Sequence, residues 1–177
     1  MTLDRNQDLK DYVRNVPDFP EPGILFRDIT PLLQNAAAFE VAMTALCEYV
    51  GPKRPDAIIG IESRGFIFGA PIADRLGLPF VPIRKPGKLP AARMTVEYQL
   101  EYGSGQLDIH ADALEPGQGA IIVDDLLATG GTAAGAAKLV ELIGGKVLGA
   151  AFLIELPGLG GRAALGGIDI FALMEFA

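Results

Sequence analysis

The sequence predicts an α/β fold in which helices cover both faces of a central, Rossmann-like parallel sheet. Two observations support this prediction. Short apolar runs typical of buried strands alternate along the chain with longer segments of helical spacing. Turn residues separate these segments, and a βαβ order of this kind places consecutive strands parallel in one sheet. In such a sheet, ligands bind beyond the carboxyl ends of the strands.

Apolar runs mark the predicted strands, and Asp, Pro or Gly precede or open them. Four runs are typical of buried strands: residues 57–61, 79–83, 120–123 and 146–154. Two segments have helical spacing: residues 65–76, which end at the C-cap candidate Gly77, and residues 132–143, which end at a Gly pair. This βαβ order is the basis of the fold prediction.

The segment from Arg84 to His110 departs from this order. It opens with a basic stretch that contains Pro and Gly, residues 84–90, and continues with residues 95–103, which alternate as a hairpin strand does. His110 then falls in the strand that follows. A long insertion between sheet strands is more often functional than idle, so we expect a lid. Residues 1–177 are predicted to form one domain that carries this insertion.

Composition and charge exclude several classes of protein. No apolar run approaches the roughly 20 residues of a membrane span, and the N-terminus is too polar for a secretory signal. A net charge of −7 opposes nucleic-acid binding. Cys47 is the single cysteine, so we expect a buried thiol without an internal disulfide, and a cytoplasmic chain. Because His110 is the single histidine, neither a His-based triad nor a zinc cluster can be assembled.

The run Val-Asp-Asp-Leu-Leu-Ala-Thr-Gly-Gly-Thr, residues 123–132, carries the strongest chemical signal. Two carboxylates follow an apolar strand and could accept hydrogen bonds from the vicinal diol of a sugar. A Gly-rich loop then opens a helix, where converging N–H groups and the helix dipole favour a terminal phosphate. The predicted sugar and phosphate contacts are Asp124, Asp125, Ala128, Thr129, Gly130, Gly131 and Thr132. The competing interpretation is a C-cap turn with two solvated aspartates; a P-loop is excluded because its Gly-Lys-Ser/Thr element is absent.

This run resembles the signature with which type I phosphoribosyltransferases bind 5-phosphoribosyl diphosphate (PRPP). Four further segments are similar to motifs of that family. They are an adenine-side motif within residues 18–33, the loop Glu62-Ser63-Arg64-Gly65-Phe66, the basic stretch at residues 84–90 and the lid sequence at residues 100–103. The resemblance covers roughly residues 12–156 and keeps the five motifs in the family's order.

The chain is most similar to the members of this family that use adenine, and the resemblance implies their reaction. Adenine and PRPP give AMP and diphosphate, with Mg²⁺ bound by oxygens of the substrate. We expect no protein residue to bind the metal directly, with contact from Asp124 or Asp125 only through water. The resemblance also implies a homodimer, and a cis peptide bond between Glu62 and Ser63.

The resemblance assigns the leaving diphosphate to the loop after residue 61 and to the lid. The implied contacts are Ser63, Arg64, Arg84, Lys85, Lys88 and Tyr102. Arg64 is also implied to be catalytic, because the departing diphosphate must be held while positive charge develops on the sugar. A solvated cluster of loop charges is the alternative for the lid cations, and a helix N-terminal cap is the alternative for residues 62–65.

Base recognition is implied at the N-terminal motif. Phe26 is expected to stack on adenine, the backbone of Leu25 to recognise its Watson–Crick edge, and Arg27 to approach the phosphate side. Ala128 is expected to line the base pocket as well as to open the phosphate loop. Glu101, in the lid, is implied to be catalytic through contact with the purine or the cationic transition state; a surface glutamate in a hairpin is the alternative.

Two other functions are compatible with the phosphate loop. A phosphoribosyltransferase for hypoxanthine, guanine or xanthine would share residues 124–132, but the motif that contains Leu25 and Phe26 favours adenine. A regulator that senses PRPP without catalysis would carry a DNA-binding domain. The residues before Tyr12 are too few for one, and the chain is acidic.

Overall fold

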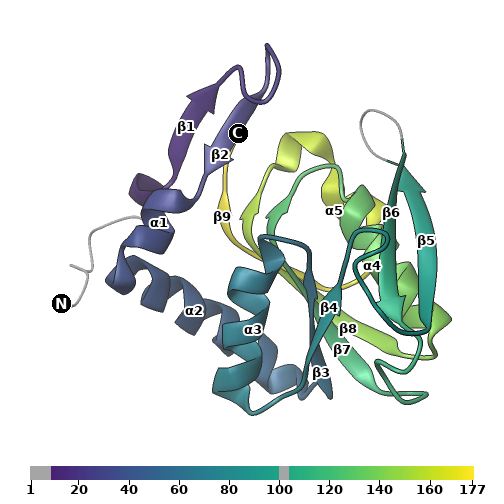
Figure 1. The fold of residues 1–177 in the computed structure, drawn as a ribbon. Helices are drawn as coiled ribbons and strands as arrows, with labels where there is room; N and C mark the ends of the chain where they lie inside the picture. Colours follow the sequence, from purple (N-terminus) through teal and green to yellow (C-terminus); the bar gives the residue numbers. More distant parts are fainter. Residues whose placement is uncertain (1–8, 100–103) are drawn as a thin grey trace. The chain divides into compact units, whose positions relative to one another are not determined.

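The computed structural model describes residues 9–99 and 104–177, which form two compact units (Figure 1). The first unit ends at Ala45 and the second runs from Leu46 to Ala177, so the boundary falls within helix α2 (Ala36–Val50). Within the described ranges, the helices are all too short or too polar to cross a membrane.

An antiparallel hairpin opens the first unit. A 3-10 turn, η1 (Leu9–Tyr12), precedes β1 (Arg14–Pro17), which pairs with β2 (Leu25–Asp28). Asp18 closes the connecting turn, because its Oδ1 accepts the N–H of Gly23 at 2.7 Å. The sequence pattern did not predict this hairpin, since both strands are short and prolines lie in and beside the turn.

Two helices follow the hairpin in the chain, α1 (Thr30–Gln34) and α2. Asn35 lies between them, and its Oδ1 accepts the N–H of Ala38 at 3.0 Å, which is the bond of an N-cap residue. Cys47 is partly exposed on α2, so the prediction of a buried thiol is wrong. The reason is helical geometry: Leu46 and Val50, four residues apart, share the buried face, and Cys47 lies beside it.

Five parallel strands form the sheet of the second unit, in the order β4–β3–β7–β8–β9. The strands are β3 (Ala57–Ile61), β4 (Phe80–Ile83), β7 (Gly119–Leu127), β8 (Lys146–Glu155) and β9 (Ile170–Glu175). The first four match the predicted runs, and the predicted α/β class is confirmed. β9 was not predicted, because it follows a Gly-rich tail and most of its residues are only partly buried, so no alternation marks it.

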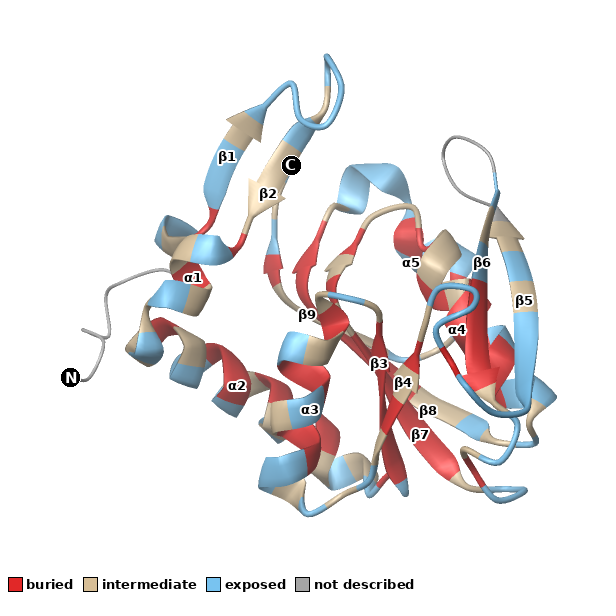
Figure 2. Cartoon of the chain, viewed as in Figure 1, coloured by how far each residue is buried: buried red, intermediate tan, exposed pale blue. Residues whose placement is uncertain are grey.

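Helices cover both faces of this sheet (Figure 1). Helix α3 (Gly65–Leu76) connects β3 to β4, and α4 (Gly131–Leu142) connects β7 to β8. Gly77 ends α3 with a left-handed φ of 65°, as the C-cap prediction requires. Shorter helical segments are η2 (Gly51–Lys53), η3 (Pro157–Leu159) and α5 (Gly161–Ala164). The strands between these helices are the most buried part of the unit (Figure 2).

The insertion between β4 and β7 forms the predicted hairpin. Strands β5 (Arg93–Gln99) and β6 (Ser104–His110) pair antiparallel. The buried Asp108 anchors the hairpin: its carboxylate accepts the Thr95 hydroxyl at 2.6 Å and lies 3.1 Å from Nε of Arg93. His110 ends β6, as expected for the strand after the lid.

The strand order changes direction between β3 and β7. From β3 the chain passes through α3 to β4 on one side, whereas β7 lies on the other side and leads to β8 and β9. Such a switch point leaves a crevice beyond the carboxyl ends of the two strands. Gly60 pairs with Val123, and β3 ends one residue later, while β7 continues beside β8 to Leu127. Asp124 and Asp125 therefore lie within β7, not after it as predicted. Asp124 is level with the last residue of β3, and Asp125 lies past it.

Candidate active site

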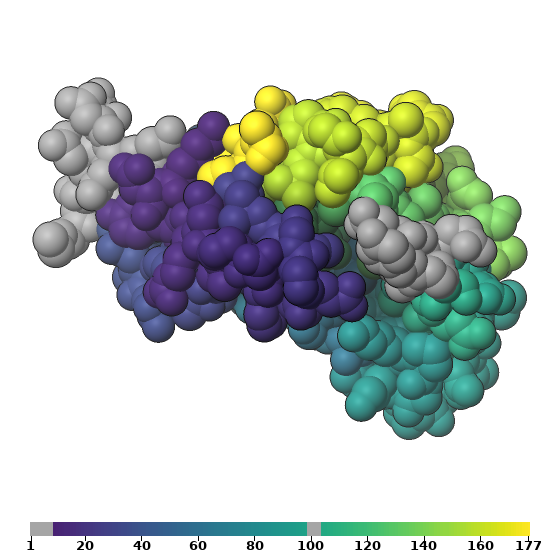
Figure 3. All heavy atoms as spheres, turned by 90° about the horizontal axis from the view of Figure 1, so that it is seen from above, coloured from purple at the N-terminus to yellow at the C-terminus, as the bar shows by residue number. Residues whose placement is uncertain are grey.

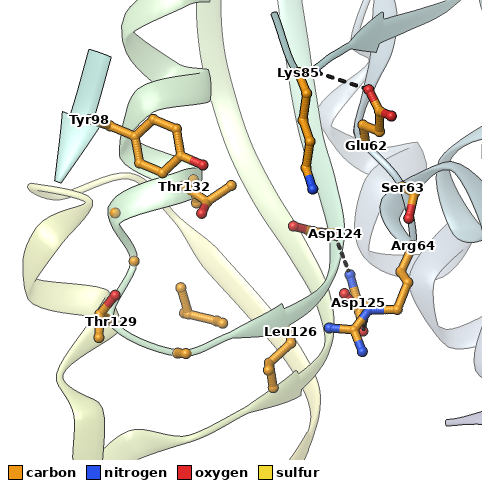
Figure 4. Close-up of a pocket in the computed structure, with 15 residues that line it drawn as sticks. Glu62, Ser63, Arg64, Lys85, Tyr98, Asp124, Asp125, Leu126, Thr129 and Thr132 are labelled. Carbon is orange, nitrogen blue, oxygen red and sulfur yellow. Dashed lines mark hydrogen bonds and ion pairs between the residues drawn. The ribbon is translucent and has the colours of Figure 1, made fainter. Parts of the chain in front are cut away.

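A cavity of about 370 Å³ lies at this switch point (Figure 4). Its lining comes from the second unit: the loop after β3, the end of β7 with the loop after it, and the start of α4. The insertion adds one residue from its basic stretch, Lys85, and one from its hairpin, Tyr98. The lining residues are Glu62, Ser63, Arg64, Lys85, Tyr98, Asp124, Asp125, Leu126, Leu127, Ala128, Thr129, Gly130, Gly131, Thr132 and Ala133.

Close packing between α3 and β7 brings the two sides of the cavity together. A Cβ built on Gly65 would lie 2.7 Å from the carbonyl oxygen of Val123 and 2.9 Å from Oδ1 of Asp124, so a larger residue does not fit there. As a result Arg64, the preceding residue, reaches Asp125. Its Nε lies 3.0 Å from Oδ2 of that aspartate (Figure 4).

The two adjacent aspartates have different surroundings. Burial raises the pKa of Asp124 well above its usual range, and the negative charge of Asp125 raises it further. Burial also raises the pKa of Asp125, but the Arg64 guanidinium opposes that rise. The N–H of Asp125 donates to Oδ1 of Asp124 at 2.9 Å. The pair therefore favours a single proton on Asp124, with the charge of Asp125 balanced by Arg64.

Asp124→Asn is expected to stabilise the fold at alkaline pH. The raised pKa means that the folded chain binds this proton more tightly than the unfolded chain does. Wild-type stability is therefore lost as the pH rises from the ordinary pKa of 3.8 through the raised pKa. Asparagine does not titrate, so the free energy of unfolding of the variant does not fall in this way. Relative to the wild type, it should therefore rise by about 1 kcal/mol or more between about pH 5 and about pH 8.5, or about 2–4 °C in Tm. A difference in Tm that is the same at both pH values would contradict the raised pKa.

The loop between β7 and α4 presents groups that bind anions. Gly130 has a left-handed φ of 82°, and α4 starts at the next residue without a side-chain cap in the described structure. The first N–H groups of a helix have no partner inside it and carry partial positive charge. Residues 129–133, which carry these groups, line the cavity, and Thr129 and Thr132 add hydroxyls (Figure 4). A phosphate is the ligand that such a loop suits.

Helix α5 supports this loop. A Cβ built on Gly130 would lie 2.5 Å from the Gly161 carbonyl oxygen. The space-filling view shows green and yellow-green parts of the chain in contact at the surface (Figure 3). Arg162 fixes α5 to the sheet: its Nε lies 2.8 Å from Oε1 of the buried Glu155, and its Nη1 donates to the carbonyl of Ile170 at 3.1 Å. The phosphate loop thus rests on a segment that is bonded to the end of β8 and to the start of β9.

Glu62 connects the end of β3 to the insertion. Its Oε2 accepts the backbone N–H of Lys85 at 2.9 Å and lies 3.2 Å from Nε of Arg84. Burial acts to raise the pKa of Glu62, but the hydrogen bonds from Lys85 and Arg84 outweigh it, so the pKa is lowered. The ionised carboxylate thereby holds the Lys85 backbone, and the lysine side chain extends into the cavity (Figure 4). The peptide bond from Glu62 to Ser63 is cis, as the family resemblance implied.

Comparisons with known proteins agree with this geometry. The model of the phosphoribosyl transferase domain family matches residues 29–162. The adenine phosphoribosyltransferase of a Synechococcus strain is 53% identical over 169 residues, which cover 96% of this chain and 99% of the relative. The chain belongs to the adenine phosphoribosyltransferase family.

Solved structures of adenine phosphoribosyltransferases share the fold over nearly the whole chain. That of Thermoanaerobacter pseudethanolicus has a TM-score of 0.92 and 52% identity, over 95% of this chain and 98% of its own. That of Saccharomyces cerevisiae, complexed with adenine and D-2,5-dideoxy-2,5-imino-altritol 1,6-bisphosphate, has a TM-score of 0.87 and 42% identity, over 93% and 96%. These similarities confirm the predicted family, enzyme class and fold.

The cavity contains most of the predicted sugar, phosphate and diphosphate contacts. Predicted residues that line it are Ser63, Arg64, Lys85, Asp124, Asp125, Ala128, Thr129, Gly130, Gly131 and Thr132. Arg84 and Lys88 are described but do not line it; Arg84 instead bonds Glu62, and its Nη1 donates to the Lys88 carbonyl at 3.3 Å. Glu101 and Tyr102 lie outside the described residues.

The predicted adenine-side residues lie on β2 in the first unit. Leu25 is exposed, and Phe26 packs edge-to-face on Phe19 with 5.1 Å between the ring centroids. Arg27 donates from Nη1 to Oδ1 of Asn15 at 2.5 Å. These contacts fix the shape of the hairpin, and the roles of the three residues toward adenine stay predictions.

Sequence reasoning did not single out five residues that line the cavity, namely Glu62, Tyr98, Leu126, Leu127 and Ala133. Four of them lie within or beside the recognised motifs, and this position was enough to predict that they line the cavity. Tyr98 is different, because it lies near the end of β5 and no local pattern marks it. It reaches the cavity only because the hairpin packs on α4.

Proposed function

We propose that this chain transfers the 5-phosphoribosyl group of PRPP to adenine and gives AMP and diphosphate in purine salvage. The observation that carries the proposal is the cavity at the switch point, which combines an acid pair, a phosphate-binding loop and two cations, Arg64 and Lys85. Family membership supports the choice of base, since the yeast relative is complexed with adenine.

We assign the ribose 5-phosphate half of PRPP to residues 124–132. The carboxylate of Asp125 accepts hydrogen bonds from the ribose hydroxyls, and the carboxyl group of Asp124 offers a further oxygen acceptor. The N–H groups at the start of α4, with the hydroxyls of Thr129 and Thr132, donate to the 5-phosphate. Because β7 and α4 are rigid elements, these bonds hold the anomeric carbon in one orientation for attack.

We assign the diphosphate to Ser63, Arg64 and Lys85, with Arg84, Lys88 and Tyr102 contributing from the insertion. The bond from the anomeric carbon to the diphosphate breaks with negative charge on the leaving group and positive charge on the sugar. Fixed cations stabilise the first charge, and Asp125 holds the Arg64 guanidinium in place for this task at 3.0 Å. Glu101 is assigned to the purine or to the cationic sugar.

Adenine is assigned to the hairpin of the first unit, as the family resemblance implied. Phe26 stacks on the ring, the backbone of Leu25 recognises the exocyclic amine, and Arg27 approaches the phosphate side. Adenine presents a donor where the 6-oxopurines present an acceptor, so a backbone group in this position discriminates between them.

The residues present suit Mg²⁺ that arrives with the substrate. Asp124 and Asp125 line the cavity and offer oxygen acceptors to the water shell of the ion. Among the residues that the structure describes, no cluster of three or more His, Cys, Asp or Glu side chains could hold a metal. As the family resemblance implied, we assign the ligands of the ion to oxygens of PRPP and to water. When bound, the ion neutralises part of the diphosphate charge.

The experiment is diphosphate release from PRPP and Mg²⁺, measured with adenine, hypoxanthine, guanine and xanthine in turn. We expect turnover with adenine, and kcat/KM for each 6-oxopurine lower by about 100-fold or more. Turnover with hypoxanthine but not adenine would contradict the base, and no turnover with any purine would favour a PRPP-sensing regulator.

The remaining predictions concern organisation and location. We propose that residues 1–177 act as one phosphoribosyltransferase domain, in a cytoplasmic homodimer, as the family resemblance and the composition suggested. Sedimentation equilibrium tests the dimer, because one chain has a mass of 18.7 kDa and the expected particle has twice that mass.

A further inference from the structure

Tyr98 enters the cavity from the hairpin of the insertion, on the side away from Glu62 and Arg64 (Figure 4). It lies on β5 and lines the cavity together with Thr132 and Ala133, at the start of α4. In the close-up its hydroxyl end lies toward Thr132, on the phosphate-loop side of the cavity and away from Glu62 and Arg64 (Figure 4).

Two glycines hold the ring in this position. A Cβ built on Gly135, in α4, would lie 3.1 Å from Cγ of Tyr98, and a Cβ built on Gly105, its cross-strand partner in β6, would lie 2.7 Å from Cζ and from the hydroxyl oxygen. Gly135 lies inside a helix and Gly105 inside a strand, where glycine lowers the stability of the element. The ring therefore packs where side chains on two neighbouring elements would have blocked it.

The packing of the ring does not require a tyrosine, because a phenylalanine ring would fill the same space. The hydroxyl is the part that packing does not explain, since it lies at the rim of a cavity whose nearest residues are the phosphate loop. A phenolic O–H is a donor, and a donor beside converging N–H groups adds to an anion site.

We propose that the Tyr98 hydroxyl donates a hydrogen bond to the 5-phosphate of PRPP and is a further binding residue of the site. The inference rests on the proposed function, in which residues 129–133 hold that phosphate. Thr129 and Thr132 donate from the loop, while Tyr98 donates from the hairpin. The bound phosphate thereby connects α4 to β5. Glu101, which is predicted to be catalytic, follows Tyr98 by three residues in the sequence.

The test uses Tyr98→Phe, which keeps the ring between Gly135 and Gly105 and removes the hydroxyl alone. Titration calorimetry with ribose 5-phosphate should show a Kd about 10- to 100-fold higher than that of the wild type, because a hydrogen bond to a charged group is lost. The Kd for pyrophosphate should not change, since that ligand is assigned to the other end of the cavity. Tm should also stay within about 2 °C of the wild type, because the packing is kept.

Tyr49→Phe is the matched control. The Tyr49 hydroxyl donates to the carbonyl of Asp169 at 2.9 Å and does not line the cavity, so this variant should bind both ligands as the wild type does. An unchanged Kd for ribose 5-phosphate in Tyr98→Phe, or an equal loss of pyrophosphate binding, overturns the inference. Wild-type protein that binds no ribose 5-phosphate would overturn the proposed function instead.

Discussion

Asp125→Asn is expected to lower kcat/KM for PRPP by about 10- to 100-fold. The carboxylate is 4% exposed and lies 3.0 Å from Nε of Arg64, so it serves two ligands: the ribose diol and the guanidinium assigned to the diphosphate. An amide presents N–H donors where acceptors are needed, and loss of a hydrogen bond to a charged group costs about 1.5–3 kcal/mol. Steady-state kinetics with PRPP varied at saturating adenine measure the effect.

A matched control for this variant is Asp112→Asn. Asp112 is exposed in the turn after β6 and does not line the cavity, so its kinetics should equal those of the wild type. An unchanged kcat/KM for PRPP in Asp125→Asn would contradict the assignment of this residue to the ribose hydroxyls.

Gly130→Ala is expected to damage both the fold and the phosphate site. The residue has a φ of 82°, and a Cβ would lie 2.5 Å from the Gly161 carbonyl oxygen and 2.9 Å from Cβ of Ala164. Left-handed strain costs about 1–3 kcal/mol, and the collision with backbone adds to it. We expect the free energy of unfolding to fall by about 2–4 kcal/mol in urea titrations. KM for PRPP should rise at least tenfold, because the loop N–H groups no longer converge.

Gly158→Ala is the control for this substitution. Gly158 lies in η3, and a Cβ there would meet nothing within 4 Å. The control should therefore keep wild-type stability and KM. If Gly130→Ala behaved like Gly158→Ala, the loop would not depend on the left-handed residue or on its contact with α5.

Local sequence patterns were sufficient for the inner part of the fold. The strand over residues 57–61 and the helix over residues 65–76 have the predicted bounds, because each is a fully buried run or an amphipathic segment with a clear end at Gly77. Helix α4 and its phosphate loop were also recognisable, since glycine and threonine at a strand–helix junction have few other uses.

Features that depend on contacts between distant segments were not predictable in the same way. Asp124 and Asp125 lie inside β7 because β8 extends four register positions beyond the pairing of Val123, which no local pattern reveals. The same holds for β9, whose residues become a strand only beside β8. Tyr98 lines the cavity because two glycines, one of them 37 positions later in the sequence, make room for its ring.

The central claim is that residues 124–132 bind ribose 5-phosphate. The most direct measurement is a ¹⁵N-HSQC titration of the assigned protein with ribose 5-phosphate. We expect the largest amide shift changes at Thr129, Gly130, Gly131 and Thr132, with smaller changes at Asp124 and Asp125. Saturable changes confined to other parts of the chain, with this loop unaffected, would contradict the claim.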